Sequence, residues 1–134
     1  MYLVDTNIFL EVMLLQKRKA DCEKFLELLK TGKNSGVITD FSIHSIIVIM
    51  SSLNKTAELR TFLQSLTAYK GLHIHCTTIL EEIKATAIVT EQKLDMDDAI
   101  QLQAAITACA DAIVSYDKHF NNLNIPRKEP QQIQ

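Results

Sequence analysis

The first nine residues constrain the fold most strongly, because a short apolar run there ends abruptly on a carboxylate. Residues 2–4 favour a β-strand, the polar residues 5–7 follow, and apolar residues at helical spacing resume at Ile8. The pattern predicts a buried strand whose carboxyl end delivers Asp5 to the turn before a helix. Open α/β sheets bind ligands at that edge, outside the carboxyl ends of their strands. Asp5 is therefore the first candidate functional residue.

The rest of the chain alternates between short apolar runs and longer segments with helical periodicity. Predicted strands cover residues 2–5, 36–39, 72–76 and 112–115, and predicted helices cover 8–16, 20–30, 41–50, 55–69, 78–93 and 99–110. Strands that are separated by one or two helices imply right-handed crossovers and a parallel sheet covered on both faces. The sequence therefore predicts an α/β fold, a three-layer α/β/α sandwich with a central parallel sheet. The helix at 41–50 is apolar almost all round, which predicts that it is buried.

The length of 134 residues is enough for one domain with its own hydrophobic core. Only 3 glycines and 2 prolines are present, which favours long regular elements joined by short connections. We expect a single domain over residues 1–126. Residues 127–134 are expected to form a C-terminal tail, in which a short edge strand is followed by a frayed end.

Composition argues against several classes of protein. The 3 cysteines are widely spaced, which indicates buried thiols rather than a disulfide framework or a structural zinc site. The net charge of −2 gives no overall basic footprint for nucleic acid, and the local basic run at residues 17–19 is interpreted first as a solvated turn. No apolar run approaches the ~20 residues that a membrane span requires, and no signal-peptide pattern begins the chain. We therefore expect a cytoplasmic protein without membrane contact.

Two of the predicted strands end in the same way, with an aspartate within two residues of the apolar run. These residues are Asp5 and Asp117. If the fourth strand lies beside the first, both acids border the point where strand order reverses, and Asp98 in the first turn of a helix can lean over the same edge. Three converging carboxylates repel one another unless a cation lies between them, which points to Mg²⁺ or Mn²⁺. Asn7 and Ser115 lie beside the acids and could orient a ligand or the attacking water.

Structural explanations compete with this interpretation for each residue. Asp98 could simply complement the helix dipole, and Asp117 could begin a turn. A carboxylate after a buried strand is harder to explain by capping, so Asp5 is the strongest candidate. The two histidines within residues 73–75 share one strand face without a third ligand nearby and are interpreted as structural. His44 lies on a helix that is predicted to be buried, where a hydrogen-bonded core histidine is the ordinary explanation.

Three segments resemble the motifs of the PIN-domain family. Val4–Ile8 is similar to the family's opening strand, Asp98–Ala105 to its central acidic helix, and Ala112–Phe120 to its last acidic strand, in the same order and spacing. PIN domains are metal-dependent ribonucleases, best known as the VapC-type toxins of prokaryotic toxin–antitoxin pairs. The resemblance therefore implies single-stranded or structured RNA as substrate, an antitoxin protein as partner, and a homodimer.

The resemblance also implies roles for individual residues. Asp5, Asp98 and Asp117 would be the metal ligands. The chain departs from the family at the second acidic position, where members usually carry a glutamate and this sequence offers His44. His119 likewise occupies a place that is acidic in many members. Imidazole suits Mn²⁺ or a softer ion better than Mg²⁺, so we expect the loss of a carboxylate to weaken activity with Mg²⁺.

Three hypotheses for the function follow. The first is an active ribonuclease, such as the toxin of a toxin–antitoxin pair, in which the three aspartates hold the ion and Asn7 and Ser115 assist hydrolysis of a phosphodiester. The second is a catalytically weakened PIN domain that binds RNA or another protein. The reason for this hypothesis is that His44 stands where family members usually carry a glutamate. The third is a receiver or phosphatase domain, which is disfavoured because no Asp-x-Asp motif or Gly-rich loop follows a predicted strand.

Overall fold

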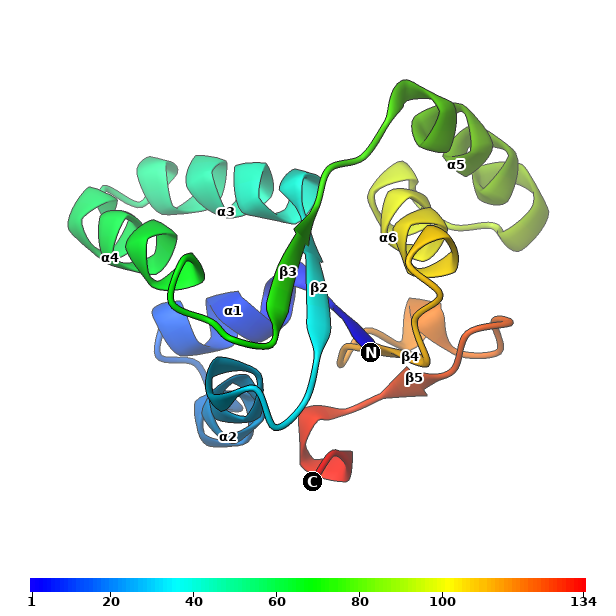
Figure 1. Cartoon of the computed structure of the whole chain (residues 1–134). Coiled ribbons are helices and arrows are strands. Elements are labelled where there is room, and N and C mark those ends of the chain that lie inside the picture. Colours follow the sequence, from blue (N-terminus) through cyan, green and yellow to red (C-terminus); the bar gives the residue numbers. More distant parts are fainter.

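Five parallel strands form the central sheet, in a computed structural model that describes residues 1–134 (Figure 1). The strands are β1 (Tyr2–Val4), β2 (Gly36–Thr39), β3 (Leu72–His75), β4 (Ala112–Val114) and β5 (Arg127–Lys128). Their order in the sheet is β3-β2-β1-β4-β5, and every neighbouring pair is parallel. The chain therefore moves outward from β1 through β2 to β3 and then returns to the other side of β1. This is the reversal of strand order that was predicted beside Asp5.

Six α-helices cover the two faces of the sheet. They are α1 (Thr6–Met13), α2 (Lys19–Thr31), α3 (Asp40–Ser52), α4 (Thr56–Leu66), α5 (Ile79–Gln92) and α6 (Met96–Thr107), and two short 3₁₀ turns, η1 (Lys118–Phe120) and η2 (Pro130–Gln132), lie near the C-terminus. Helices α1 to α4 lie on one side of the sheet, and α5 and α6 on the other (Figure 1). The predicted three-layer α/β/α sandwich is confirmed.

The two halves of the core follow from the alternation of side chains along each strand. In β1, Val4 packs with α1 and α2, while Leu3 packs against α6. In β4, Val114 joins the first of these clusters and Ile113 the second. Residues two positions apart face the same side of a strand, so the α6 side that holds Leu3 and Ile113 is also the side toward which Asp5 points.

Helix α3 is less buried than its apolar sequence predicts. Ser42, Ile46 and Met50 are buried and recur every four residues, so they form one stripe that faces α1 and α4. Val48, on the opposite side, is 67% exposed, and His44 is exposed as well. The prediction of a fully buried α3 is wrong, because the layer has no further element outside this helix.

Two other predictions also need correction. Cys22 is buried as predicted, but Cys76 and Cys109 are exposed. The C-terminal end does not fray, because η2 packs against α2 and Ile133 is only 8% exposed in the core beside it. The C-terminal segment has little regular structure, and burial of the Ile133 side chain holds it against the core. No helix has the length and hydropathy that crossing a membrane would take.

Candidate metal centre

Asp5 and Asp117 reach the same edge of the sheet because β1 and β4 are paired in register. Val4 lies opposite Val114, and the Asp5 backbone N–H donates to the Val114 carbonyl at 3.1 Å. Asp5 and Ser115 therefore leave the sheet at the same height, and Asp117 follows two residues later on the same face. The sheet register brings the acids at the ends of β1 and β4 together.

Asp98 comes to this edge on α6, which packs closely on the sheet. Ala99, Ala104 and Ala105 are fully buried, and such small side chains allow the helix to approach the strands. Asp98 lies in the first turn of α6, so its side chain leans past the helix start toward the ends of the strands. Burial raises the pKa of Asp98 to about 6, and the charges of Asp117 and Asp5 add to the rise. The three predicted acids therefore share one electrostatic environment.

Asp5 lies at the base of the site and is only 7% exposed. Burial raises the pKa of its carboxyl group, and the charge of Asp117 acts in the same direction. Hydrogen bonds from the Ser115 hydroxyl and from the backbone N–H groups of Thr6 and Asn7 oppose this rise. A buried carboxylate with a raised pKa, surrounded by other acids, indicates a place where a cation is favourable.

Ser115 connects two of the acids directly. Its hydroxyl donates to Oδ2 of Asp5 at 2.7 Å and accepts a hydrogen bond from the backbone N–H of Asp117 at 2.9 Å. Ser115 is fully buried, so both bonds form away from bulk water. The residue predicted to orient a ligand is placed by the structure as a bridge that sets Asp117 relative to Asp5.

His119, the second residue of η1, lies beside the cluster of acids. Its Nδ1 lies 3.2 Å from Oδ1 of Asp117 and 3.5 Å from Oδ2 of Asp98, and its backbone N–H donates to Asp117. One ligand atom from each of Asp98, Asp117 and His119 lies within 4.8 Å of the other two. Two carboxylate oxygens and one imidazole nitrogen form a donor set that fits a divalent first-row cation. These side chains could therefore hold a divalent cation, whereas Asp5, the third predicted ligand, lies outside this cluster.

Asn7 lines a pocket beside the acids, as its position in the sequence suggested. The pocket has a volume of about 160 Å³ and is lined by Asp5, Thr6, Asn7, Phe41, Ser45, Ile49, Asp97, Asp98 and Gln101. Its wall therefore comes from α1, α3 and α6, all of which begin at the carboxyl edge of the sheet. A small group such as a phosphate or a water cluster could enter beside the carboxylates.

His44 does not reach the acids. It lines a shallower hollow on the outer side of α3 with Phe41, Val48 and Asp97. The next residue, Ser45, lines both this hollow and the acidic pocket. The spacing Ser42, Ser45, Ile49 could have identified this face, because residues three or four apart share one side of a helix. Helix α3 thus contributes a hydroxyl, and no carboxylate, to the pocket.

A buried polar network below the pocket was not predicted. The hydroxyl of Thr6 donates to Ser42 at 2.8 Å, Thr39 donates to Ser42 at 3.1 Å, and the Gln101 amide reaches both Thr6 and Ser42. Thr39 and Ser42 are fully buried, and Gln101 is 3% exposed. The network joins the starts of α1 and α3 to α6. A glutamine inside the apolar stripe of α6 was the available sequence signal.

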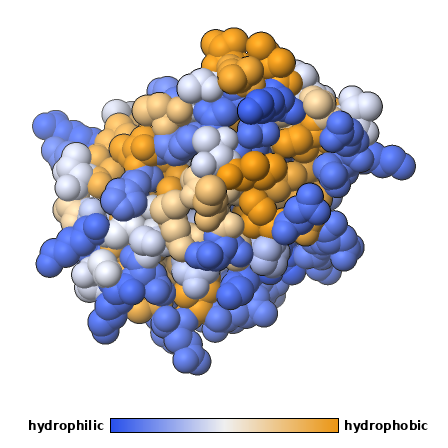
Figure 2. All heavy atoms as spheres, turned by 45° about the vertical axis from the view of Figure 1, so that its right-hand side comes forward, coloured by the Kyte–Doolittle hydropathy of each residue, from blue (hydrophilic) through white to orange (hydrophobic).

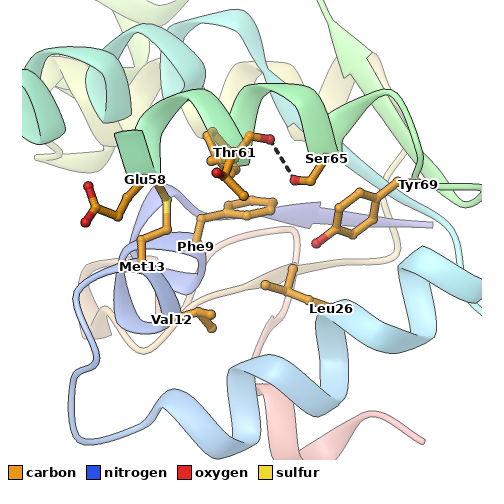
Figure 3. Close-up of a pocket in the computed structure, with 9 residues that line it drawn as sticks. Phe9, Val12, Met13, Leu26, Glu58, Thr61, Ser65 and Tyr69 are labelled. Atoms are coloured by element: carbon orange, nitrogen blue, oxygen red, sulfur yellow. Dashed lines mark hydrogen bonds between the residues drawn. The ribbon is translucent and has the colours of Figure 1, made fainter. Parts of the chain in front are cut away.

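A second cleft lies on the other face of the sheet, between α1, α2 and α4 (Figure 3). It has a volume of about 310 Å³ and is lined by Phe9, Val12, Met13, Leu26, Glu58, Thr61, Phe62, Ser65 and Tyr69. Glu58 lies at one end of the cleft and Tyr69 at the other, with the Phe9 ring between them (Figure 3). Glu58 is the one carboxylate in this lining, so the cleft lacks the converging acids of the metal centre.

An apolar surface covers the outer side of α5. Ile79, Leu80 and Ile83 are 72%, 61% and 60% exposed. Figure 2 shows hydrophobic atoms gathered at the top of the molecule, at the height of α5 in Figure 1. Exposed apolar patches of this kind mark contacts with other molecules in soluble proteins. We call the group of Ile79, Leu80 and Ile83 the α5 patch.

Comparison with known proteins gives a consistent picture. A family model described as PIN domain matches residues 1–119. Among solved structures, a toxin–antitoxin complex from Klebsiella pneumoniae has a TM-score of 0.73 at 19% identity and covers 97% of this chain and 98% of that one. Curated protein sequences give no significant match.

Two further structures are similar. VapC20 from Mycobacterium tuberculosis, described as a sarcin-ricin loop cleaving toxin, has a TM-score of 0.72 at 9% identity and covers 88% of this chain and 91% of that one. VapBC2 from Rickettsia felis, bound to a DNA fragment from its promoter, has a TM-score of 0.71 at 18% identity and covers 96% and 97%. At these identities, the structural likeness shows the fold.

Proposed function

The chain belongs to the PIN domain family, and from this premise we propose that it is a ribonuclease that hydrolyses RNA phosphodiester bonds with the help of a divalent cation. The observation that carries the proposal is the cluster of Asp98, Asp117 and His119 at the reversal of strand order, with the charge of Asp5 acting on Asp98. These groups come from three separate parts of the chain, and helix capping or surface charge does not account for their meeting.

Each group has a distinct part in this proposal. Asp98, Asp117 and His119 hold Mg²⁺ or Mn²⁺, and Asp5 supplies negative charge at the base of the site. When bound, the cation neutralises the charge that develops on the phosphate and makes water easier to deprotonate. Asn7, on the pocket wall, orients the phosphate or the attacking water, and Ser115 keeps Asp5 and Asp117 in place.

The test is cleavage of end-labelled RNA, both single-stranded and structured, by the purified protein. We expect cleavage with Mn²⁺ or Mg²⁺, none with EDTA, and none by Asp5→Asn, because that variant removes the buried negative charge at the base of the site. Glu91→Gln is the matched control, since Glu91 is an exposed carboxylate on α5. Equal cleavage by wild type and Asp5→Asn would point to a contaminating nuclease and overturn the proposal.

A second candidate function is a weakened PIN domain that binds RNA or a protein without cutting. The observation in its favour is that α3 places Ser45, rather than a carboxylate, beside the acidic pocket. If the missing carboxylate limits the activity, Ser45→Glu increases cleavage with Mg²⁺, whereas His44→Glu on the outer side of α3 does not. A wild type that binds RNA without cutting, together with a Ser45→Glu variant that cuts, would favour this second function.

An antitoxin protein is the partner that we propose for the apolar cleft between α1, α2 and α4. Two of the similar structures are described as toxin–antitoxin assemblies, and the cleft has room for the apolar side chains of a short helix. The product of the neighbouring reading frame should then copurify with this chain and suppress cleavage. Thr61→Arg, which fills the cleft, should prevent copurification, and Thr67→Arg outside the cleft should not.

A homodimer that forms in the cytoplasm through the α5 patch completes the proposal. Three isoleucine and leucine side chains are exposed on this helix, and removing their apolar surface from water in an interface is favourable. Light scattering should then give the mass of two chains for wild type and of one chain for Ile83→Glu. Thr90→Glu, also exposed on α5, serves as the control. A monomeric wild type would exclude the dimer without affecting the nuclease proposal.

A further inference from the structure

The C-terminal strand holds the loop that carries Asp117. Arg127 is the first residue of β5, and its side chain is only 16% exposed. Its Nη1 donates to the Ser115 carbonyl at 2.8 Å and to Oε1 of Glu129 at 3.1 Å, and its Nε donates to Oδ1 of Asn121 at 2.6 Å. One guanidinium therefore contacts the chain on both sides of Asp117.

These contacts enclose the segment that supplies two of the proposed metal-holding side chains. Ser115 immediately precedes residues 116–120, Asn121 immediately follows them, and Asp117 and His119 lie between. The last paired residues of β4 and β5 are Val114 and Lys128, so the sheet ladder ends before this segment begins. A guanidinium is planar, and its Nε and Nη1 point in fixed directions. The group can therefore fix the spacing between the two ends of the segment.

The geometry points to Arg127 as a positioning residue that sets where Asp117 and His119 stand relative to Asp5 and Asp98. The connection runs through Ser115, whose carbonyl accepts from Arg127 and whose hydroxyl bonds to both Asp5 and the Asp117 backbone. The inference rests on the proposed function, because the side chains that are positioned are those that we propose to hold the cation.

The charge of Arg127 is compensated away from the acids. Its ion pair is with Glu129, and the hydrogen bond from Arg127 is the main reason that the pKa of Glu129 lies below its ordinary value. The residue is therefore not a counter-charge for the metal centre. Its effect on that centre is geometric, which a change in metal affinity and turnover, without a change in RNA affinity, would reveal.

The experiment compares Arg127→Gln and Arg127→Lys with wild type, with Lys128→Gln as the matched control. Lys128 is the next residue on β5, and its Nζ lies over the Tyr2 ring at 5.9 Å from the ring centroid. We expect Arg127→Gln to weaken Mn²⁺ binding and to lower kcat by about 10- to 100-fold, as when groups that orient metal ligands are removed. KM for RNA and all properties of Lys128→Gln should stay near wild type. Arg127→Lys should recover part of the loss, because an ammonium can hold only one end of the segment.

Two further measurements separate positioning from folding. Thermal unfolding identifies a variant that simply fails to fold, and Asn121→Ala removes one contact while Arg127 stays, so it carries the test in that case. Amide hydrogen exchange over residues 116–121 reports the hold on the segment directly, and we expect it to be faster in Arg127→Gln and in Asn121→Ala than in wild type.

The outcomes for the two proposals are distinct. If wild type cuts RNA and Arg127→Gln matches Lys128→Gln in Mn²⁺ affinity and kcat, the positioning role is overturned and the nuclease proposal stands. If wild type binds no Mn²⁺ and cuts no RNA, the nuclease proposal fails. Hydrogen exchange then decides the positioning role, and equal exchange in wild type and Arg127→Gln would overturn it.

Discussion

His119 is the residue whose chemistry most distinguishes the proposed metal centre from one built of carboxylates alone. Its Nδ1 lies beside Asp98 and Asp117, and imidazole nitrogen favours Mn²⁺ and later first-row ions over Mg²⁺. We expect pulsed electron paramagnetic resonance of the Mn²⁺-loaded protein to show coupling to one nitrogen. His119→Asp should abolish that coupling and shift the ratio of Mn²⁺ to Mg²⁺ affinity toward Mg²⁺.

The other histidines provide the control for this measurement. His73→Asn changes an exposed imidazole on β3 and should leave the nitrogen coupling unchanged. A coupling of equal strength in His119→Asp would show that His119 is not a ligand. The remaining carboxylates would then hold the ion by themselves.

Asp98 should make the metal-free protein less stable as the pH rises. Its pKa is about 6 in the folded protein, against an ordinary value of 3.8, so the folded state binds the proton more tightly than the unfolded chain does. The contribution of the protonated group is present below pH 3.8 and is lost as the pH rises to about 6 and beyond. We expect the free energy of unfolding of wild type, relative to Asp98→Asn, to fall over this window in urea titrations with EDTA. A flat difference would contradict the shared burial and charge of the acids.

At the level of single elements, sequence reasoning succeeded where one local rule determines the result. An apolar run that ends on Asp5 or Ser115 specifies a strand and its carboxyl end, and helix α6 places Asp98 by its first turn. Sequence reasoning failed where the burial of a residue depends on which other elements pack against its element. The sequence of α3 does not show that Val48 faces water, and the two residues of β5 and one buried Ile133 carry too little periodicity to predict a packed C-terminus.

The same limit applies to the site. A strand pattern identifies which residue ends the strand, but the choice between His44 and Ser45 depends on the rotation of α3 about its axis, which tertiary packing decides. The hold of Arg127 on Ser115 spans 12 residues with an irregular loop between them, and no local spacing rule covers such a contact. The sequence therefore indicates where an element ends, but neither the rotation of a helix about its axis nor a contact across a loop.

Helix α5 offers a test of stability at the element scale. Its start is a capping box, in which the Thr78 hydroxyl accepts from the Glu81 backbone at 3.2 Å and the Glu81 carboxylate accepts from the Thr78 backbone at 2.8 Å. His75 also contacts Glu81 at 2.7 Å. Although burial acts to raise the pKa of Glu81, these hydrogen bonds outweigh it and lower the pKa to about 2.

We expect Glu81→Ala to destabilise the protein by about 1 kcal/mol at neutral pH, which is typical of a lost helix cap. Because the folded pKa is lowered, the contribution of Glu81 is present above its ordinary pKa of 4.5 and is lost as the pH falls toward 2. Urea unfolding at pH 7 and pH 3 checks both parts. Glu82→Ala, in the same first turn without the capping contact, is the control, and an equal effect of both variants would assign the stability to the helix dipole instead.

For the whole molecule, the two faces of the sheet carry different features that other molecules could contact. The α5 and α6 side brings Asp98 to the acids at the strand ends, while the α1, α2 and α4 side holds the apolar cleft. Strand alternation separates the two, because Asp5 and Val4 are adjacent in the chain yet face opposite layers. A protein partner could therefore occupy the cleft without entering the metal centre, and inhibition by such a partner would require contact with the loop at residues 116–121 or with the pocket beside α3.

If the proposed metal centre binds a cation, the stability of the whole molecule depends on that cation. Burial and mutual repulsion raise the pKa values of Asp5 and Asp98, so the folded protein carries a cost that a bound cation removes. A ligand that binds only the folded state at 100 times its Kd stabilises it by about 2.7 kcal/mol. We expect Mn²⁺ at that ratio to raise the Tm at pH 7.5 by several degrees, and to do so less at pH 5, where protons compete for Asp98. Asp98→Asn should lose most of the shift, Glu91→Gln should keep it, and an equal shift in both variants would place the stabilising cation elsewhere on the surface.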